Sequence, residues 1–171
     1  ALLKLPFLKH TKEIFPNSKL FWLSGKGESI FKRKLKPLSK NIIFKVYEKN
    51  YGSNIFDIFK KDEIGNFDIV IDTQKRLLTT LILKTLPSKI FISSSANFLF
   101  SDFVPSFKKE ENLTKQLINL ANIFTSKKYD GITHQQLIRS RDIIICPGAS
   151  VEWKRWDTEN FIEIAIFLKK K

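Results

Sequence analysis

The sequence predicts an α/β fold in which a parallel β-sheet is covered by helices on both faces. Two observations predict it: strand-like and helix-like segments alternate along the chain, and the strand-like segments are apolar at nearly every position. Strands that are apolar throughout are typical of parallel sheets buried on both faces. The chain has 171 residues, 43% of them hydrophobic and 27% charged, which suits one globular domain plus the start of another.

The first half of the chain opens on a helix-like segment, residues 2–15, where apolar residues recur at helical spacing between lysines and a Pro-Asn-Ser sequence follows. The run KLFWL (19–23) is short, aromatic and apolar, and the Gly-containing segment 24–27 stops it, so it is predicted as a buried strand. A strand over 41–47 and a short helix over 54–61 are expected next.

The second half continues the alternation. Its predicted elements are strands over 67–71, 89–93 and 142–146, and helices over 75–86, 110–124 and 158–170. The helix over 110–124 has leucine and isoleucine at helical spacing on one face. Pro87 closes the helix before it.

Both ends of the sequence depart from this pattern. The chain opens on a helix, although folds of this class normally open on a strand, and it ends one helix after the strand over 142–146 begins a new unit. We therefore expect both ends to be cut.

The composition excludes several kinds of protein. No apolar run approaches the roughly 20 residues that a membrane-spanning helix needs, and the single cysteine, Cys146, excludes a disulfide or a cysteine metal site within the chain. His10, predicted on a helix surface, and His134 have no partner at metal-ligand spacing. These features predict a cytoplasmic protein without a metal site.

The net charge of +13 comes mostly from lysine. Two interpretations stay open: solvated lysines that reflect a compositional bias, and a surface that meets phosphates or anionic lipid.

The segment Ile143–Trp156 leads from a predicted strand through a Pro-Gly-Ala-Ser turn to the next helix. In parallel α/β folds, ligands lie at the carboxyl ends of strands, and free N–H groups at a helix start bind phosphate there. Gly148 lets the backbone approach an anion closely, Ser150 offers a hydroxyl group and Lys154 a mobile cation. The alternative is an ordinary strand–loop–helix connection with Lys154 in solvent.

Three stretches carry a resemblance to a known family. Pro147-Gly148-Ala149-Ser150, Lys154-Arg155-Trp156 and Phe161 resemble the motif that opens the second domain of glycosyltransferase family 9, the ADP-heptose:lipopolysaccharide heptosyltransferases. FDIVIDTQ (67–74) is similar to the family's strand of the form (Y/F)D-x-(V/I)-ID-x-Q, and residues 1–23 are similar to its first helix and second strand. The three matches occur in the family's order and span the chain.

The resemblance implies a GT-B fold, two Rossmann-like domains facing a cleft. Residues 1–140 would be most of the acceptor-side N-terminal domain, without its first strand, and 141–171 the beginning of the nucleotide-sugar-binding domain. The family's general-base aspartate would lie just upstream of Ala1, so no catalytic residue is expected in this chain and the chain alone is expected to be inactive. The donor phosphates would be held by Gly148, Ala149, Ser150 and Lys154.

Two departures from the family's pattern concern the site. Asp157 stands where the family often has Pro at the helix start, and Lys75 and Leu78 stand where the heptosyltransferase I type has Gly and Lys. The identity of the acceptor, and of heptose as the transferred sugar, therefore stays open. The acceptor-side candidates are Asp72, Gln74 and Arg76, and the alternative for Asp72 is a cap at the start of the following helix.

The function that the resemblance implies is inverting transfer of a sugar, heptose from ADP-heptose, to a lipopolysaccharide core acceptor. No cofactor or metal is expected beyond the nucleotide-sugar substrate. The expected partners are a phosphorylated glycolipid and the anionic membrane surface at the inner-membrane face, with the protein peripheral and monomeric, and no nucleic acid. Two alternatives remain: a GT-B glycosyltransferase with another donor, and a basic nucleic-acid-binding α/β domain.

Overall fold

A computed structural model describes residues 2–25, 27–105, 112–126, 152 and 156–169. The chain divides into two compact units, Ala1–Ile132 and Thr133–Lys171. The domain boundary predicted at 140/141 lies outside the described residues, as does the strand predicted over 142–146.

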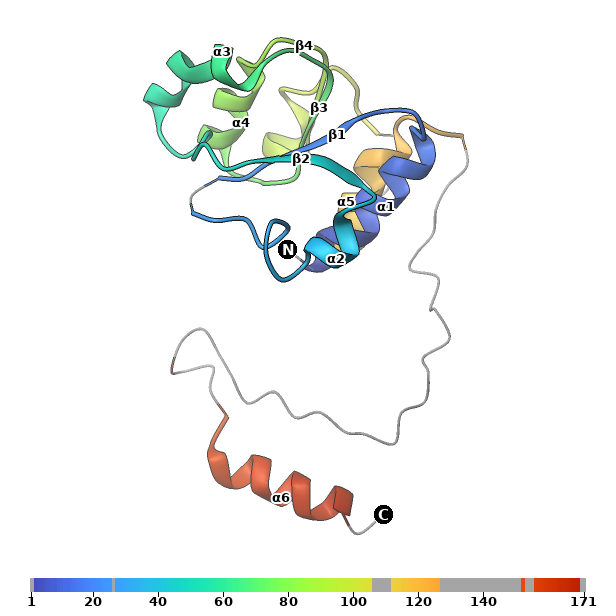
Figure 1. Ribbon diagram of the computed structural model, residues 1–171, viewed down its shortest axis with the longest axis vertical. Coiled ribbons are helices and arrows are strands. Elements are labelled where there is room, and N and C mark those ends of the chain that lie inside the picture. The colour runs from blue at the N-terminus through green and yellow to red at the C-terminus, as the bar shows by residue number, and fades with distance from the viewer. Residues whose placement is uncertain (1, 26, 106–111, 127–151, 153–155, 170–171) are drawn as a thin grey trace. The chain divides into compact units, whose positions relative to one another are not determined.

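The first unit alternates helices and strands, and α6 belongs to the second (Figure 1). The elements are η1 (Leu2–Lys4), α1 (Leu5–Ile14), β1 (Leu20–Leu23), α2 (Lys36–Ser39), β2 (Ile43–Tyr47), η2 (Ile55–Lys60), α3 (Lys61–Ile64), β3 (Phe67–Asp72), α4 (Leu77–Lys84), β4 (Ser88–Ser93), η3 (Ser95–Phe98), α5 (Leu113–Asn122) and α6 (Thr158–Lys169). The strands and helices predicted over described residues are present, with ends shifted by a few residues, except that the segment 54–61 differs in kind. The short helices α2, α3 and η3 were not predicted.

The helix predicted over 54–61 is different in kind, because most of it is the 3-10 helix η2. Its start is held by Asp57, whose Oδ2 accepts hydrogen bonds from the backbone N–H groups of residues 52, 53 and 54 at 3.1, 3.0 and 2.9 Å. The carboxylate thereby holds the turn of residues 52–54 against the first residues of η2, which favours a tight 3-10 start.

The four strands among the described residues form two parallel pairs, whereas the sequence predicts one sheet. The registers run from Leu20↔Ile43 to Leu23↔Tyr47 for β1 with β2, and from Phe67↔Ser88 to Asp72↔Ser93 for β3 with β4. Within the described part of the chain no strand pairing joins β1 to β3, and a cavity of about 750 Å³ is lined by both of them. We call this the inter-strand cavity. An apolar strand pattern predicts burial on both faces but does not identify the neighbouring strand, so the pattern alone does not predict the gap.

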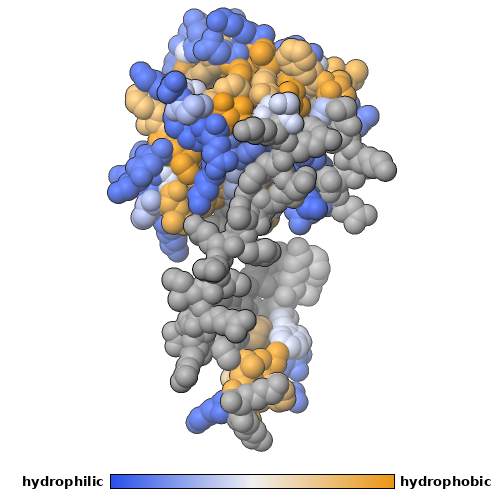
Figure 2. Space-filling view, turned by 90° about the vertical axis from the view of Figure 1, so that its right-hand side faces the viewer, coloured by the Kyte–Doolittle hydropathy of each residue, from blue (hydrophilic) through white to orange (hydrophobic). Residues whose placement is uncertain are grey.

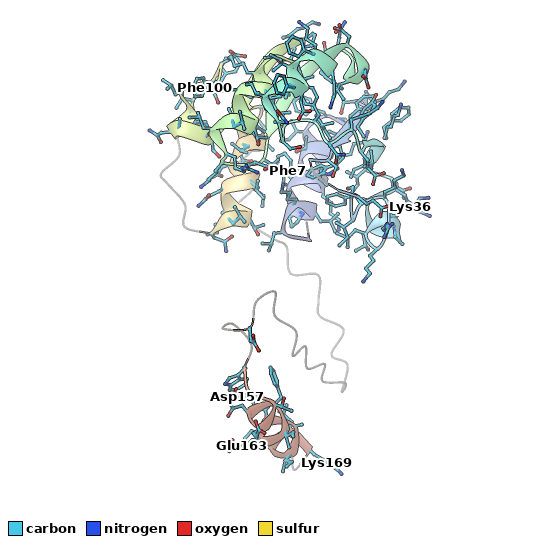
Figure 3. All side chains as sticks on the ribbon, turned by 90° about the vertical axis from the view of Figure 1, so that its left-hand side faces the viewer. Phe7, Lys36, Phe100, Asp157, Glu163 and Lys169 are labelled. Carbon is cyan, nitrogen blue, oxygen red and sulfur yellow. The ribbon has the colours of Figure 1, made fainter. Side chains whose placement is uncertain are left out.

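Helices cover two faces of these strands. One apolar cluster joins α1 and α5 to the strands, with Phe7, Leu117 and Ile92 among its buried members and Trp22 packed against it. A second cluster contains Tyr51, Ile82 and Leu86, with Leu23 packed against it. Trp22 and Leu23 are neighbours on β1 and point to opposite faces, so β1 is covered on both sides, as predicted. Figure 3 labels Phe7 within the first unit.

His10 is buried between helices, so its predicted place on a helix surface is wrong. Its side chain is 6% exposed, and Nε2 lies 2.7 Å from Oδ1 of Asn122 on α5. Since an amide oxygen only accepts, Nε2 carries the proton in this contact. The hydrogen bond ties α1 to α5, which lie side by side in Figure 1. The flanking lysines suggested an exposed helix face, but His10 lies on the same face as Phe7.

The helix α6 is described by itself. Its N-terminal region places Trp156 edge-to-face against Phe161 with ring centroids 5.2 Å apart. None of its described residues is buried, and Ile162, Ile166 and Phe167 are more than half exposed at 53%, 52% and 57%.

Candidate functional site

The candidate site lies at the carboxyl ends of β1 and β3, the edge where parallel α/β folds bind ligands. Ser24 and Gly25 follow β1, and Thr73 and Gln74 follow β3. A Cβ added to Gly25 would lie 3.8 Å from Nε2 of Gln74, so the two loops are adjacent. The fold brings these loops together although they are about fifty residues apart in the sequence.

Lys4 supplies a cation to this edge. Its Nζ donates a hydrogen bond of 2.9 Å to Oγ1 of Thr73 and lies 5.2 Å from the centre of the Trp22 ring. Burial lowers the pKa of Lys4 below its usual value, and the nearby carboxylate of Asp72 opposes part of that shift. No described carboxylate lies within ion-pair distance of Lys4, so its charge is available to an anion. Sequence reasoning missed this residue, because a single lysine in a lysine-rich helix carries no signal.

Asp72, an acceptor-side candidate, is only 1% exposed. Its Oδ2 accepts hydrogen bonds from Thr80 Oγ1 at 2.7 Å and Ser93 Oγ at 2.9 Å, and its Oδ1 accepts one from the Gln74 N–H at 2.8 Å. Asp72 does not cap α4, which begins at Leu77 with Arg76 as its N-cap residue. Its carboxylate instead holds the turn before the helix through the Gln74 N–H. Asp72 therefore fixes the position of Gln74 and joins β3, β4 and α4.

Gln74 and Arg76, the other acceptor-side candidates, are both exposed. Gln74 points its amide toward the Gly25 loop, as the 3.8 Å distance indicates. Arg76 takes the N-cap position of α4 without a side-chain capping bond. Between them, Lys75 donates a hydrogen bond of 2.6 Å to Oε1 of Gln116 and is turned toward α5. Of the three candidates, Gln74 is the one that the structure places beside another strand's loop.

The loop after β2 is tied to the loop after β1 by polar contacts. Glu48 accepts hydrogen bonds of 2.7 Å from the Ser29 N–H and from Lys32 Nζ. The hydrogen bond from Lys32 is the main cause that lowers the pKa of Glu48 below its usual range, and the bond from the Ser29 backbone adds to it. Asn50 Oδ1 accepts from the Gly27 N–H at 2.9 Å. Through these contacts Glu48 helps to order the carboxyl edge, a role that sequence reasoning did not assign.

The donor-side candidates Gly148, Ala149, Ser150 and Lys154 lie outside the described residues. Near them, Asp157 is described: its carbonyl oxygen accepts the Asn160 N–H at 3.2 Å in the first turn of α6. No cluster of three or more His, Cys, Asp or Glu side chains suited to a metal ion occurs in the described ranges.

None of the helices in the described part of the chain is long and apolar enough to cross a membrane. The fold and the site define an α/β protein with parallel strands and a polar, lysine-containing edge at the strands' carboxyl ends. Comparison of the chain with models of known protein families, with curated proteins and with solved structures finds no match.

Proposed function

We propose that the chain is the acceptor side of a GT-B glycosyltransferase that transfers a sugar, heptose from ADP-heptose, to a lipopolysaccharide core acceptor. The observation that carries the proposal is that Lys4, which donates a hydrogen bond to Thr73, and Gln74, which lies beside the Gly25 loop, both stand at the adjacent carboxyl ends of β1 and β3. A cation without a described carboxylate partner suits a phosphate, and an exposed amide suits sugar hydroxyls. A phosphorylated glycolipid presents both groups.

The order of the three family-like stretches supports the same function. In the proposed reaction, a carboxylate base takes the proton of the acceptor hydroxyl, whose oxygen attacks the anomeric carbon while the nucleoside diphosphate leaves with the bonding electrons. Ser150 and Lys154 would stabilise the charge that grows on the departing diphosphate. Lys4 and Gln74 would orient the acceptor, which reduces the entropy lost in the reaction step.

The test is binding of detergent-solubilised core lipopolysaccharide, with and without enzymatic removal of its phosphates. We expect Lys4→Met to raise the Kd of the phosphorylated acceptor by about tenfold or more, because a hydrogen bond to a charged group contributes about 1.5–3 kcal/mol. Gln74→Ala should raise the Kd for both forms of the acceptor.

The matched control is Lys89→Met. Lys89 is 81% exposed, pairs with Asp68 at 2.7 Å and belongs to β4, near the amino ends of the strands. It has the same formal charge but lies away from the proposed site, so its variant should bind like the parent chain. Equal losses for Lys4→Met and Lys89→Met would mean that net charge alone drives binding and would contradict the proposal.

Nucleic acid is the competitor that the net charge of +13 favours. Under the proposal, a single-stranded oligonucleotide should bind weakly and equally to the parent chain and to Lys4→Met. Tight, strongly salt-dependent oligonucleotide binding that displaces the glycolipid would favour the nucleic-acid function instead.

A further inference from the structure

The helix α4 has polar side chains on its inner side and leucines on its outer side. Thr79 and Thr80 are 5% and 0% exposed. The outward side chains are those of Leu77, Leu78 and Leu81, which are 51%, 38% and 41% exposed. A helix on the surface of a globular protein normally has the opposite arrangement, with its apolar side chains toward the core. We call Leu77, Leu78 and Leu81 the α4 leucine face.

Hydrogen bonds of the two threonines fix this orientation of α4. Thr80 Oγ1 donates to Asp72 Oδ2 at 2.7 Å, and Thr79 Oγ1 donates to the Gly52 oxygen at 2.8 Å. If the helix rotated about its axis to turn the leucines inward, these buried polar groups would lose their partners, which is costly. The exposure of the α4 leucine face is therefore a fixed feature of the fold.

The segment that follows β4 adds apolar side chains beside α4. Lys84 Nζ, in the last turn of α4, donates to the Phe100 oxygen at 2.7 Å and to Asp102 Oδ1 at 3.1 Å, and η3 packs against α4 (Figure 1). The exposed apolar side chains of this segment are those of Leu99, Phe103 and Val104. Clusters of exposed apolar side chains mark surfaces that contact another molecule.

The two ends of α4 carry opposite charges. Arg76 is exposed at the N-cap position, and no carboxylate of the described residues lies within ion-pair distance of it. A cation is unfavourable there, because a helix N-terminus carries partial positive charge. Beside the other end, hydrogen bonds from the Phe91 N–H and from Lys84 hold the pKa of Asp102 below its usual value. A carboxylate has about four acceptor positions, so the partly exposed Asp102 can accept from a further cation.

A second copy of this chain matches both the apolar face and the charges. A twofold axis near Leu81, in the middle of the eight-residue helix, makes two α4 helices antiparallel and brings their leucine faces together. Arg76 of each copy then lies beside the last turn of α4 in the other copy. The C-terminal carbonyl groups of that helix and the Asp102 carboxylate both favour a guanidinium group. An anionic lipid surface offers a partner to Arg76 but none to Asp102, so the opposite charges favour pairing between copies.

We propose that the chain forms a twofold-symmetric dimer through the α4 leucine face, with Arg76 of each copy paired to Asp102 of the other. The dimer departs from the monomer expected from the sequence. It also gives a role to Arg76, an acceptor-side candidate that the proposed acceptor site does not use. The dimer does not rest on the sugar transfer proposed above, because the interface contains neither Lys4 nor Gln74.

Sedimentation velocity of the complete 171-residue chain over a range of concentrations measures the dimer, with circular dichroism to establish that each variant is folded. We expect Leu81→Gln to raise the Kd of the dimer by about tenfold or more, because both copies lose a buried apolar side chain. The matched control is Leu38→Gln, since Leu38 on α2 is 54% exposed and should not affect the dimer. Arg76→Glu should weaken the dimer, and Arg76→Lys should weaken it less.

Cross-linking tests the symmetry of the dimer. In a chain whose only cysteine is replaced, Cys146→Ser, the further change Leu81→Cys places a thiol group beside the proposed axis. A short bis-maleimide should join two such chains, whereas Leu38→Cys in the same background should give no covalent dimer. A parent chain that stays monomeric up to millimolar concentration would overturn the proposal, as would equal Kd values for Leu81→Gln and Leu38→Gln or equal cross-linking at both positions. If the parent is monomeric and Leu81→Gln abolishes binding to phosphatidylglycerol vesicles, the face contacts lipid instead. Acceptor binding by Leu81→Gln should equal that of the parent, so failure here is separate from failure of the proposed function.

Discussion

The charged side chain of Lys4 is partly buried, which is unfavourable for its ammonium group, and its charge can interact with an anion. Burial lowers its pKa from the usual 10.5, which means that the folded protein binds the lysine proton less tightly than the unfolded chain does. At neutral pH the charged side chain therefore costs folding stability, and this cost disappears as the pH rises through the lowered folded value toward 10.5. A partly buried lysine whose charge carries such a cost is a candidate for function.

We predict that Lys4→Met leaves the melting temperature at pH 7 unchanged or higher, because Met keeps the contact with the Trp22 ring without a buried charge. The difference between variant and parent should shrink as the pH approaches 10.5. Thermal unfolding from pH 7 to pH 10.5 measures both. A destabilised variant whose loss is independent of pH would show that Lys4 serves the fold through its bond to Thr73.

At the scale of elements, Asp57 holds the turn that joins β2 to η2 and α3. Burial by itself raises the pKa of Asp57, but hydrogen bonds from the backbone of Asn54 and Ser53 and from Lys60 outweigh it and lower the pKa. A carboxyl group with a lowered folded pKa contributes stability that is present above its unfolded value of 3.8 and is lost as the pH falls through the folded value.

Asp57→Asn should therefore lower the free energy of unfolding at pH 7 by about 1–3 kcal/mol, the cost of weakening buried hydrogen bonds to a charged group. The difference between the variant and the parent should become smaller as the pH falls below the unfolded value of 3.8 and through the lower folded value, where the parent loses its own contribution. Urea unfolding at a series of pH values measures this. Asp62→Asn on α3 is the control, because Asp62 is exposed. This variant should unfold like the parent at every pH. Equal effects of the two substitutions would contradict the role of the Asp57 network.

The helices and strands were predictable because they depend on local spacing, whereas the contacts of the site depend on elements far apart in the chain. The run FDIVID predicted β3 well, but that Asp72 binds Thr80 and Ser93 follows from the approach of α4 and β4. Lys4 and His10 lie in one lysine-rich helical segment, and only the packing of β3 and α5 against it separates their roles. The gap between β1 and β3 does not follow from the apolar patterns of these strands, because such patterns do not identify which strands pair.

At the scale of the whole molecule, the net charge of +13 has two interpretations, solvated lysines or attraction to an anionic surface. Apolar side chains also reach the surface: Phe56 and Phe59 on η2 are 68% and 77% exposed, and Figure 2 shows apolar areas among hydrophilic ones on one face of the first unit. Charge and apolar insertion are thus separate routes to a membrane surface, and they respond differently to salt.

We predict that the chain co-sediments with phosphatidylglycerol vesicles at low salt, because each lysine near an anionic surface contributes about 1 kcal/mol. Binding should fall steeply as the salt concentration rises, since the screening length shrinks from about 30 Å at 0.01 M to about 3 Å at 1 M. Phosphatidylcholine vesicles should bind little at any salt concentration, and Phe59→Ser should bind like the parent chain. If phosphatidylcholine binds equally well, the lysines are a compositional feature. If Phe59→Ser abolishes binding that salt does not weaken, insertion of the η2 aromatic side chains replaces charge as the explanation.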